Sequence, residues 1–244
     1  MAVKHKQNVV ILPTEEDVAV SLAPYVAGLS QKAIQEKGSF SVVLSGGTLI
    51  DTLRKLTQPP YKETVNWSKW LIFWVDERVV SLDSPDNNFL LAWNGFLSKP
   101  SAEAVAKDYE AQLRKLVEKK VLPLSATGFP KFDLMLLGIG PDGHVASLFP
   151  SRPQRYDKTD WVTYITDSPK PPPPRITFTF PVINSATDIA MVVTDKEEAE
   201  AVYITLEHIK VTPSLPCSEV QAEVLTTWFL DKDAASLLPP NYKK

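Results

Sequence analysis

The stretch FDLMLLGIGPDGHVASLFP, residues 132–150, does most to indicate the fold. Residues 132–138 form a short apolar run, which is typical of a strand buried on both faces of a parallel sheet. A polar loop with three glycines, Asp142 and His144 follows immediately. Glycine costs backbone entropy, so such a cluster marks a tight turn or the close approach of another group. Because open α/β sheets bind ligands at the carboxyl ends of their strands, this loop is the first candidate site.

The rest of the chain alternates apolar runs with segments of helical period. Strands are predicted at 8–12, 40–44, 70–75, 175–180 and 188–194, and helices at 14–38, 86–97, 101–120 and 195–209. This alternation favours an α/β fold with a doubly wound, mostly parallel sheet and helices on both faces, as in Rossmann-like proteins. No internal repeat and no clear linker divides the 244 residues, so a single domain over 1–244 is predicted.

The first predicted helix has recognisable signals at both ends. Thr14 and Asp17 have the spacing of a capping box, and Gly38 is a typical residue to end a helix. Pro24 lies inside this segment and is expected to kink it.

Composition limits the partners and the compartment. A net charge of -3 and a pI near 5.7 give no electrostatic reason to expect binding to nucleic acid or to an anionic membrane. Cys217 is the only cysteine, which excludes a disulfide within the chain and a cysteine metal cluster, and indicates a reducing compartment. The apolar run at residues 9–12 is too short for a signal peptide, and no segment reaches transmembrane length. We therefore expect a cytoplasmic protein.

The proline-rich run PKPPPP at 169–174 has two interpretations. It could dock into an aromatic groove of a partner protein. Alternatively, it is a stiff loop that leads into the strand beginning at Arg175. The second interpretation is favoured because the run directly adjoins a predicted strand.

Polar residues follow several predicted strands. Ser45, Gly46, Gly47 and Thr48 stand between a strand and a helix, where backbone N–H groups and the helix dipole can bind phosphate. An ordinary strand-to-helix turn would have the same sequence. Arg78, in the segment Asp76–Arg78, could bind phosphate with both arms of its guanidinium group or form a salt bridge with a neighbouring carboxylate.

The loop of residues 138–144 supplies a possible proton-transfer pair. His144 could act as a general base with Asp142 setting its tautomer, or it could be a structural histidine beside a helix start. His5 and His208 stand among polar or charged neighbours and are expected at the surface.

These features are more informative together than singly. A phosphate-binding turn, an arginine and a histidine all follow strands whose carboxyl ends can meet at one crevice. The sequence has no G-x-S-x-G elbow, no histidines at metal-ligand spacing, no Walker loop and no dinucleotide fingerprint. This leaves general-base chemistry on a small phosphorylated substrate, with neither a metal nor a cofactor expected.

The chain resembles the glucosamine-6-phosphate isomerase/6-phosphogluconolactonase family over almost its whole length. The most specific segment is GIGPDGHVASLFP (138–150). Weaker segments are VVLSGG (42–47), WVDERVV (74–80), SPDNNF (84–89), DSPKPPPPRITFTFPVIN (167–184) and WFLDKDAA (228–235). The style of SKWLIFWVDERVV (68–80) is similar to that of plant lactonases in the family.

The resemblance implies hydrolysis of 6-phosphoglucono-1,5-lactone to 6-phosphogluconate, a step of the oxidative pentose phosphate pathway. It implies that His144 is the general base that activates water and that Asp142 supports it. The expected partner is this phosphorylated sugar lactone, and a monomer is expected.

The resemblance also assigns the residues that bind the substrate. Phosphate would lie at Ser45, Gly46, Gly47 and Thr48, with Arg78 and Arg175 as cationic contacts. Asp76 would line the sugar pocket, and the loop glycines, including Gly140, would let the backbone approach the sugar.

One position distinguishes lactonase from isomerase within the family. The isomerases carry a glutamate five residues after the histidine, and this chain has Phe149 there. An apolar side chain cannot relay a proton, so lactonase is preferred and the amino-sugar phosphate isomerase is the less favoured alternative.

The sequence departs from the family pattern after Pro100, where a further segment is usual, and at Asp195 and Glu198, where a glycine and a lysine are common. Asp195 is a good residue to cap a helix. Glu198 is expected in the first turn of the helix after residues 188–194, either turned to solvent or close enough to a bound phosphate to repel it. These departures support an alternative of another class, a catalytically weak paralogue that binds a phosphosugar or a partner protein.

Overall fold

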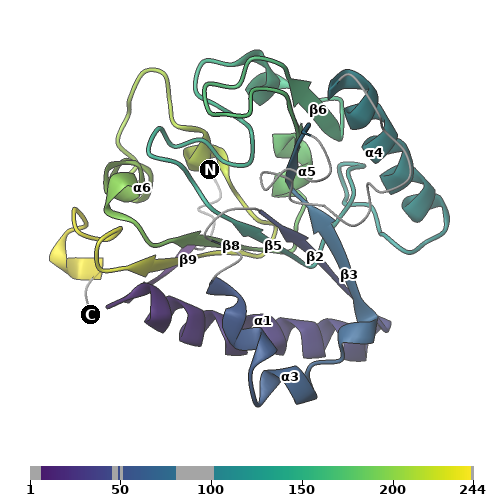
Figure 1. Cartoon of the computed structure of the whole chain (residues 1–244), viewed down its shortest axis with the longest axis horizontal. Coiled ribbons are helices and arrows are strands. Elements are labelled where there is room, and N and C mark those ends of the chain that lie inside the picture. The colour runs from purple at the N-terminus through teal and green to yellow at the C-terminus, as the bar shows by residue number, and fades with distance from the viewer. Residues whose placement is uncertain (1–6, 46–48, 50–51, 81–101, 243–244) are drawn as a thin grey trace.

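A computed structural model of the chain describes residues 7–45, 49, 52–80 and 102–242. Its main sheet has six strands in the order β1-β9-β8-β5-β2-β3, and every neighbouring pair is parallel (Figure 1). The strands are β1 (Gln7–Leu12), β2 (Phe40–Leu44), β3 (Trp70–Trp74), β5 (Leu134–Leu137), β8 (Asp188–Val193) and β9 (Leu225–Asp231). The prediction of a mostly parallel α/β sheet is confirmed, although the sequence did not predict β9.

A second, smaller sheet was not predicted. It contains β4 (Asp76–Arg78), β7 (Arg175–Phe178) and β6 (Val162–Ile165) in the order β4-β7-β6, with antiparallel pairing. The predicted strand at 175–180 therefore exists, but it ends at Phe178 and belongs to this sheet. Because β4 begins two residues after β3 ends, the second sheet starts at the carboxyl edge of the first.

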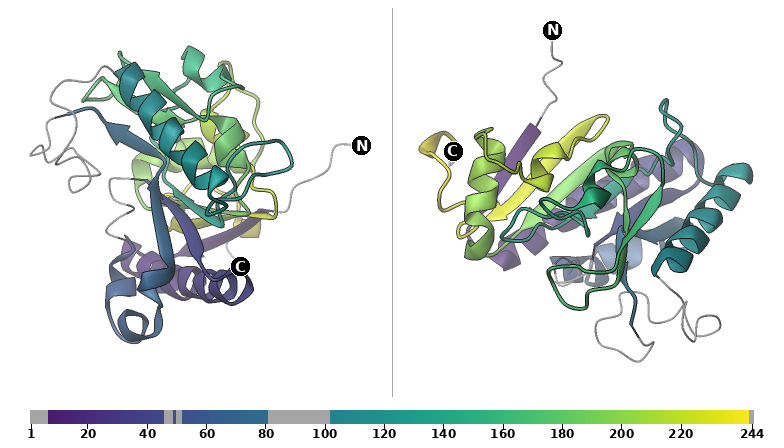
Figure 2. Two further views of the ribbon diagram at one scale, coloured as in Figure 1. Left: turned by 90° about the vertical axis from the view of Figure 1, so that its right-hand side faces the viewer. Right: turned by 90° about the horizontal axis from the view of Figure 1, so that it is seen from above.

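Helices cover both faces of the main sheet (Figures 1 and 2). On one side lie α1 (Glu15–Lys37) and α3 (Tyr61–Thr64), and on the other α4 (Ala102–Glu118), α5 (Phe180–Asn184) and α6 (Ala199–Leu206). Two separate clusters of buried apolar side chains, one on each side, fill the space between the sheet and these helices. Short 3₁₀ turns also occur at Arg54–Thr57, Trp67–Lys69, Pro153–Tyr156, Lys196–Glu198, Pro216–Glu219 and Pro240–Tyr242.

The ends of α1 are formed as the sequence predicts. The Thr14 side chain accepts a hydrogen bond from the backbone N–H of Asp17 at 3.2 Å, and Gly38 ends the helix with φ of 83°. The helix runs through Pro24 without interruption. Val18 and Leu22 are fully buried against the sheet, so packing of the apolar face holds the helix together across the proline.

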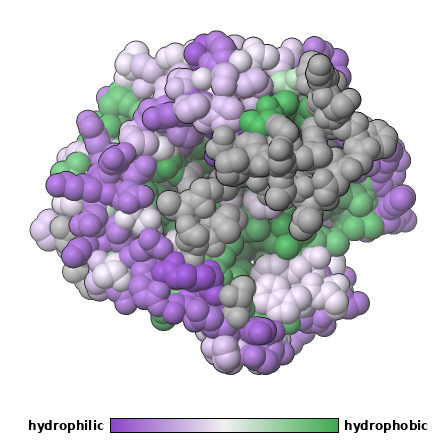
Figure 3. Space-filling view, in the orientation of Figure 1, coloured by the Kyte–Doolittle hydropathy of each residue, from purple (hydrophilic) through white to green (hydrophobic). Residues whose placement is uncertain are grey.

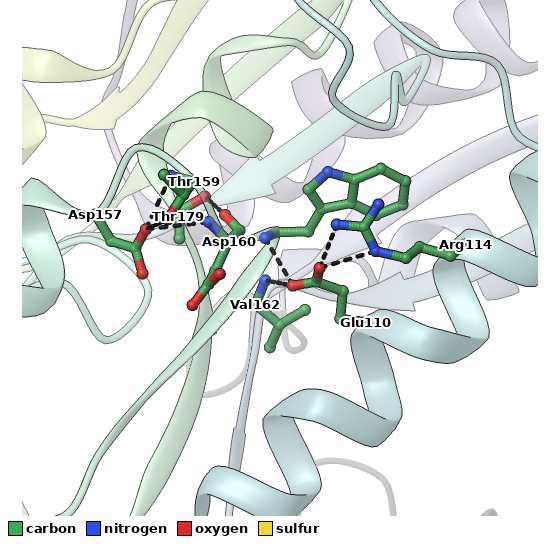
Figure 4. A network of polar contacts seen from close by, with 8 residues as sticks. Glu110, Arg114, Asp157, Thr159, Asp160, Val162 and Thr179 are labelled. Atoms are coloured by element: carbon green, nitrogen blue, oxygen red, sulfur yellow. Dashed lines mark hydrogen bonds and ion pairs between the residues drawn. The ribbon is translucent and has the colours of Figure 1, made fainter.

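A polar network attaches α4 to the small sheet (Figure 4). Glu110 accepts hydrogen bonds from the backbone N–H groups of Trp161 and Val162 at 2.8 and 3.1 Å. Arg114 pairs with the same carboxylate and lies over the Trp161 ring, 4.1 Å from its centroid. A further hydrogen bond of 2.7 Å runs from the Thr179 hydroxyl to the Asp160 carbonyl. These contacts fix α4 against the small sheet.

The exterior is mixed in character. The face in Figure 3 is largely hydrophilic at its left and lower margins and more hydrophobic nearer its centre. Among the helices of the described residues, none is long and apolar enough to cross a membrane.

Some predictions fall outside the described residues. These are the helix at 86–97, the stretch from Gly46 to Thr48, the departure after Pro100, and His5. His208 is exposed, as predicted.

Candidate active site

A cavity of about 170 Å³ opens where the carboxyl ends of β2, β5 and β8 meet β4 and β7. Its wall includes five of the predicted site residues: Ser45, Asp76, Arg78, His144 and Arg175. It also includes Asp195 and Glu198, the two positions that depart from the family pattern. The remaining lining residues are Leu49, Gly138, Ile139, Ala146, Val192, Val193 and Thr194. Residues that lie far apart in the chain are thus brought to one site, as expected for an open α/β sheet.

The histidine and the aspartate of the glycine loop form a close pair. His144 Nδ1 lies 2.5 Å from Asp142 Oδ1, and the His144 side chain is 17% exposed. Partial burial opposes the charge on Asp142, but the hydrogen bond and charge of His144 outweigh it and lower the pKa of Asp142 below its ordinary value. Asp142 is therefore ionised at neutral pH and accepts the proton on Nδ1. The lone pair of the imidazole is then left on Nε2.

Gly140 lies against the histidine ring. A methyl group at this position would lie 2.2 Å from His144 Cε1 and 2.4 Å from Nδ1. The Gly140 N–H also donates to the His144 carbonyl at 3.1 Å. Gly140 was expected to contact the sugar, but it does not belong to the cavity wall formed by the described residues. Its position instead restricts the orientation of the His144 imidazole ring.

The segment of residues 214–219 supports the glycine loop of residues 138–144. The Cys217 N–H donates to the Gly143 carbonyl at 2.9 Å, and a methyl group on Gly143 would lie 2.8 Å from Leu215 Cβ. Arg155, which is completely buried, donates through Nε to Glu219 at 2.9 Å and through Nη1 to the Ser214 carbonyl. The buried Arg155 therefore fixes, through its pairing with the partly exposed Glu219, the segment that supports the loop.

Ser147 attaches the loop after β5 to the small sheet. It is fully buried, and its hydroxyl donates to Asp76 Oδ2 at 3.0 Å. Its backbone N–H donates to the Thr177 hydroxyl at 3.1 Å. The neighbouring Ala146 has φ of 52°, a left-handed conformation that alanine rarely adopts. The tight turn after His144 is thus held in place by bonds to β4 and β7 of the small sheet. Ser147 was not singled out in the sequence, although a serine within the most specific segment was a usable signal.

Two arginines stand side by side in the cavity wall. Arg78 on β4 is the direct antiparallel partner of Arg175 on β7. Burial lowers the pKa of Arg175 from its ordinary value, the charge of Asp76 opposes this, and the charge of Arg78 adds to it. Like charges directly opposite each other are unfavourable, so an anion bound between them would be stabilising.

Arg175 also organises the proline-rich run. Its guanidinium donates to the carbonyls of Lys170, Pro171 and Pro172 at 3.0 to 3.2 Å. Only Nη1 is directed to the site, 3.5 Å from the Ser147 hydroxyl. The interpretation of residues 169–174 as a stiff loop leading into β7 agrees with these bonds.

Asp195 and Glu198 both line the cavity. The capping by Asp195 and the exposure of Glu198 differ from what the sequence predicted. Asp195 occupies the N-cap position of the 3₁₀ turn Lys196–Glu198, but its side chain makes no capping hydrogen bond. The predicted helix at 195–209 accordingly begins later, at Ala199. Glu198 does not turn fully to solvent: its Oε2 is enclosed and has no hydrogen-bond partner. Burial, aided by the charges of Asp195 and Glu197, raises the pKa of Glu198 to about 7.

Replacing Glu198 with glutamine should stabilise the fold at alkaline pH. The pKa of Glu198 is raised from 4.5 to about 7, so its contribution to stability is full below pH 4.5 and is lost as the pH rises through 7. Glutamine does not titrate. Allowing for solvent screening of this partly exposed group, we expect a gain of about 1 kcal/mol, or roughly 2–4 °C in Tm. Thermal unfolding near pH 5 and pH 8 measures it, and Glu197→Gln is the control. An equal Tm difference at both pH values would contradict the assignment.

The sequence and the fold are similar to those of known proteins. Residues 13–228 match the family model described as glucosamine-6-phosphate isomerases/6-phosphogluconolactonase. The chain is 53% identical over 250 residues to a probable 6-phosphogluconolactonase 4, chloroplastic, of Oryza sativa subsp. indica, covering 95% of this chain and 76% of the relative. It is 49% identical over 252 residues to a probable 6-phosphogluconolactonase 5 of Arabidopsis thaliana, covering 96% of this chain and 99% of the relative.

A solved structure has the same fold. The 6-phosphogluconolactonase from Trypanosoma brucei superposes with a TM-score of 0.80 at 24% identity, covering 97% of this chain and 100% of that one. Together, the family match, the similar plant sequences and the shared fold show that the chain belongs to the glucosamine-6-phosphate isomerase/6-phosphogluconolactonase family.

Proposed function

We propose that the protein is a 6-phosphogluconolactonase, which hydrolyses 6-phosphoglucono-1,5-lactone to 6-phosphogluconate in the pentose phosphate pathway. The observation that carries the proposal is one cavity wall containing His144, which is paired with ionised Asp142, and the adjacent Arg78 and Arg175. Relatives at about half identity are named as enzymes of this activity.

The paired side chains account for the transfer of protons. Asp142 accepts the proton on Nδ1, so His144 Nε2 can take a proton from water while the water oxygen bonds to the lactone carbonyl carbon. The bond between this carbon and the ring oxygen then breaks. The ring oxygen receives the proton from the imidazolium and leaves as a hydroxyl group. Because the lactone is already an activated ester, a general base and an oriented substrate suffice.

The arginines and the strand-to-helix turn account for the phosphate. Arg78 and Arg175 place two positive charges at one side of the cavity, and Ser45 lies at the end of β2 in the same wall. Backbone N–H groups of residues 45–48 would add donors for an anion. Asp76, held by Ser147, would contact sugar hydroxyls.

The surroundings of the histidine favour hydrolysis over isomerisation. The Phe149 ring is fully buried, with its centroid 4.5 Å from that of His144. It excludes water from one side of the imidazole and cannot relay a proton. Isomerisation of an amino sugar needs such a relay, so the lactonase is the better-supported activity.

The test is an assay on freshly generated 6-phosphogluconolactone, corrected for spontaneous hydrolysis. We expect turnover well above background, and a much lower rate on unphosphorylated gluconolactone. A folded protein with only the background rate would refute the lactonase and favour the phosphosugar-binding paralogue. Equal rates on the two lactones would refute the phosphate site alone.

Replacing Arg78 with glutamine should weaken binding of the phosphorylated lactone. Removing one of the two paired cations should raise its KM by roughly tenfold or more, with a smaller loss in kcat from poorer positioning. KM for gluconolactone should not change. Arg152→Gln is the control, because Arg152 pairs with the exposed Asp167 away from the cavity. An unaltered KM for the phosphorylated lactone would make Arg78 a structural residue.

The compartment and the assembly stay predictions. The rice relative is named chloroplastic and the Arabidopsis relative is not. A cytoplasmic location rests on the sequence features alone, and cell fractionation would test it. A monomer is expected, and sedimentation of the purified chain would show another state directly.

A further inference from the structure

Glu198 is a charged residue in the cavity that the hydrolytic mechanism does not use. It is the last residue of the 3₁₀ turn Lys196–Glu198, directly after the carboxyl end of β8. Its Oε2 is shielded from solvent and makes no hydrogen bond, and the residue belongs to the same cavity wall as His144 and Arg175. An enclosed carboxyl oxygen without a partner is unfavourable, so a ligand that supplies a partner would relieve the cost.

The charges that act on Glu198 oppose its ionised form on balance. It forms no salt bridge with any described residue. The two nearest acids oppose its charge, and the one lysine that favours its charge has a smaller effect than these two. The other titratable and charged groups of the cavity wall are Asp76, Arg78, His144, Arg175 and Asp195, and the charges of Asp195, Glu197 and Lys170 act on Glu198.

We propose that Glu198 sets the affinity of the cavity for phosphorylated sugars through its own protonation. When neutral, its carboxyl group donates a hydrogen bond to the phosphate. When charged, it repels the phosphate. Binding of the phosphosugar therefore takes up a proton at Glu198. This inference rests on the proposed function in one respect, the class of ligand.

The direction of the effect follows from electrostatics. A cavity of about 170 Å³ places any bound dianion within a few ångströms of its wall. At such distances the energy of the phosphate next to a charged Glu198 differs strongly from its energy next to a neutral one. The free protein already has a Glu198 pKa of about 7, and a neighbouring dianion raises it further. Each unit by which the bound phosphosugar raises the pKa of Glu198 corresponds to a tenfold loss of affinity for the phosphosugar. This loss applies at a pH where the carboxyl is charged in both the free and the bound protein. Affinity should thus fall on the alkaline side of neutrality.

The experiment is calorimetric titration with 6-phosphogluconate of the wild type and Glu198→Gln. Glutamine is isosteric with the neutral acid and donates at every pH. Near pH 8.5, Glu198→Gln should bind roughly threefold to tenfold more tightly than the wild type, and near pH 6 about equally. Comparing variants cancels the titration of the phosphate and of His144. In buffers of different ionisation enthalpy, the wild type should take up a proton near pH 7.5 that the variant does not.

Two controls test whether the gain in affinity depends on the position of Glu198 and on the phosphate group of the ligand. Glu197→Gln removes the same charge from an exposed neighbour outside the cavity wall. The charge of Glu197 raises the pKa of Glu198 less than that of Asp195 does, so this variant should differ little from the wild type. Gluconate, which lacks the phosphate, should show no difference between variants. Equal affinities of Glu198→Gln and wild type at alkaline pH, weaker binding by Glu198→Gln at both pH values, or the same gain with gluconate or in Glu197→Gln would overturn the inference.

The outcome is separable from that of the proposed function. Wild-type turnover of the lactone is measured independently of binding. Proton-linked binding without turnover would support the inference and refute the lactonase, and turnover without the linkage would do the reverse. Absence of any 6-phosphogluconate binding would overturn the inference, while the lactonase assay would still decide the activity.

Discussion

Replacement of His144 by alanine should reduce turnover of 6-phosphogluconolactone by roughly 10²–10⁴-fold, the usual contribution of a general base. Among the described residues, the side chain makes one polar contact, with Asp142, and one ring contact, with Phe149. Its removal therefore leaves the cavity wall and both arginines in place. We expect kcat to fall while KM and the affinity for 6-phosphogluconate change little, as measured by steady-state kinetics and calorimetric titration.

His208→Asn is the matched control, because His208 is exposed on the surface and asparagine tolerates its left-handed φ of 54°. It should retain wild-type turnover, and both variants should have the wild-type Tm within a few degrees. If His144→Ala hydrolyses the lactone at the wild-type rate, the base lies elsewhere, and Asp76 is the next candidate in the same wall.

Much of the main sheet could be predicted because its strands are continuous apolar runs. β1, β2, β3, β5 and β8 agree with the predicted strands to within a few residues at either end. β9, with the sequence LTTWFLD, was missed because two threonines interrupt its apolar pattern, although it pairs with β1 on one side and β8 on the other.

The small sheet could not be predicted from local pattern. β4 consists of Asp76, Glu77 and Arg78, residue types that rarely form strands. Pairing with β7 imposes the extended conformation, so tertiary contact outweighs local preference. This unpredicted pairing is what sets Arg78 opposite Arg175.

The site was predictable in composition and less so in detail. Asp76, Arg78, His144 and Arg175 were expected at one crevice and do line one cavity, whereas their catalytic and binding roles stay predictions. The environment of Glu198 depends on how the turn after β8 folds back over the cavity, which spacing alone does not reveal.

Replacement of Gly140 by alanine should disable the histidine without removing it. The added methyl group would lie 2.2 Å from His144 Cε1 and 3.1 Å from Asp142 Oδ1, so the ring and its hydrogen bond must both shift. Gly140 is not among the residues with positive φ, so alanine suits its backbone conformation and the clash is the whole effect. Misplacing a reacting group by about 1 Å costs on the order of 10² in rate. We expect a loss of that size or more in kcat.

The clash involves a side chain at the cavity rather than the packed core, so the fold should tolerate it at about 1 kcal/mol. Gly28→Ala is the matched control, because nothing lies within 4 Å of the added methyl group on α1, and helix preference should leave it neutral or slightly stabilising. Turnover, Tm and affinity for 6-phosphogluconate, measured for both variants, distinguish an effect on the histidine from an effect on the fold or on binding. A loss of turnover with retained Tm and affinity would mean that Gly140 seats the imidazole. Unchanged turnover in Gly140→Ala would mean that the ring can move by this distance at no cost, which is incompatible with a proton transfer that depends on the present His144–Asp142 geometry.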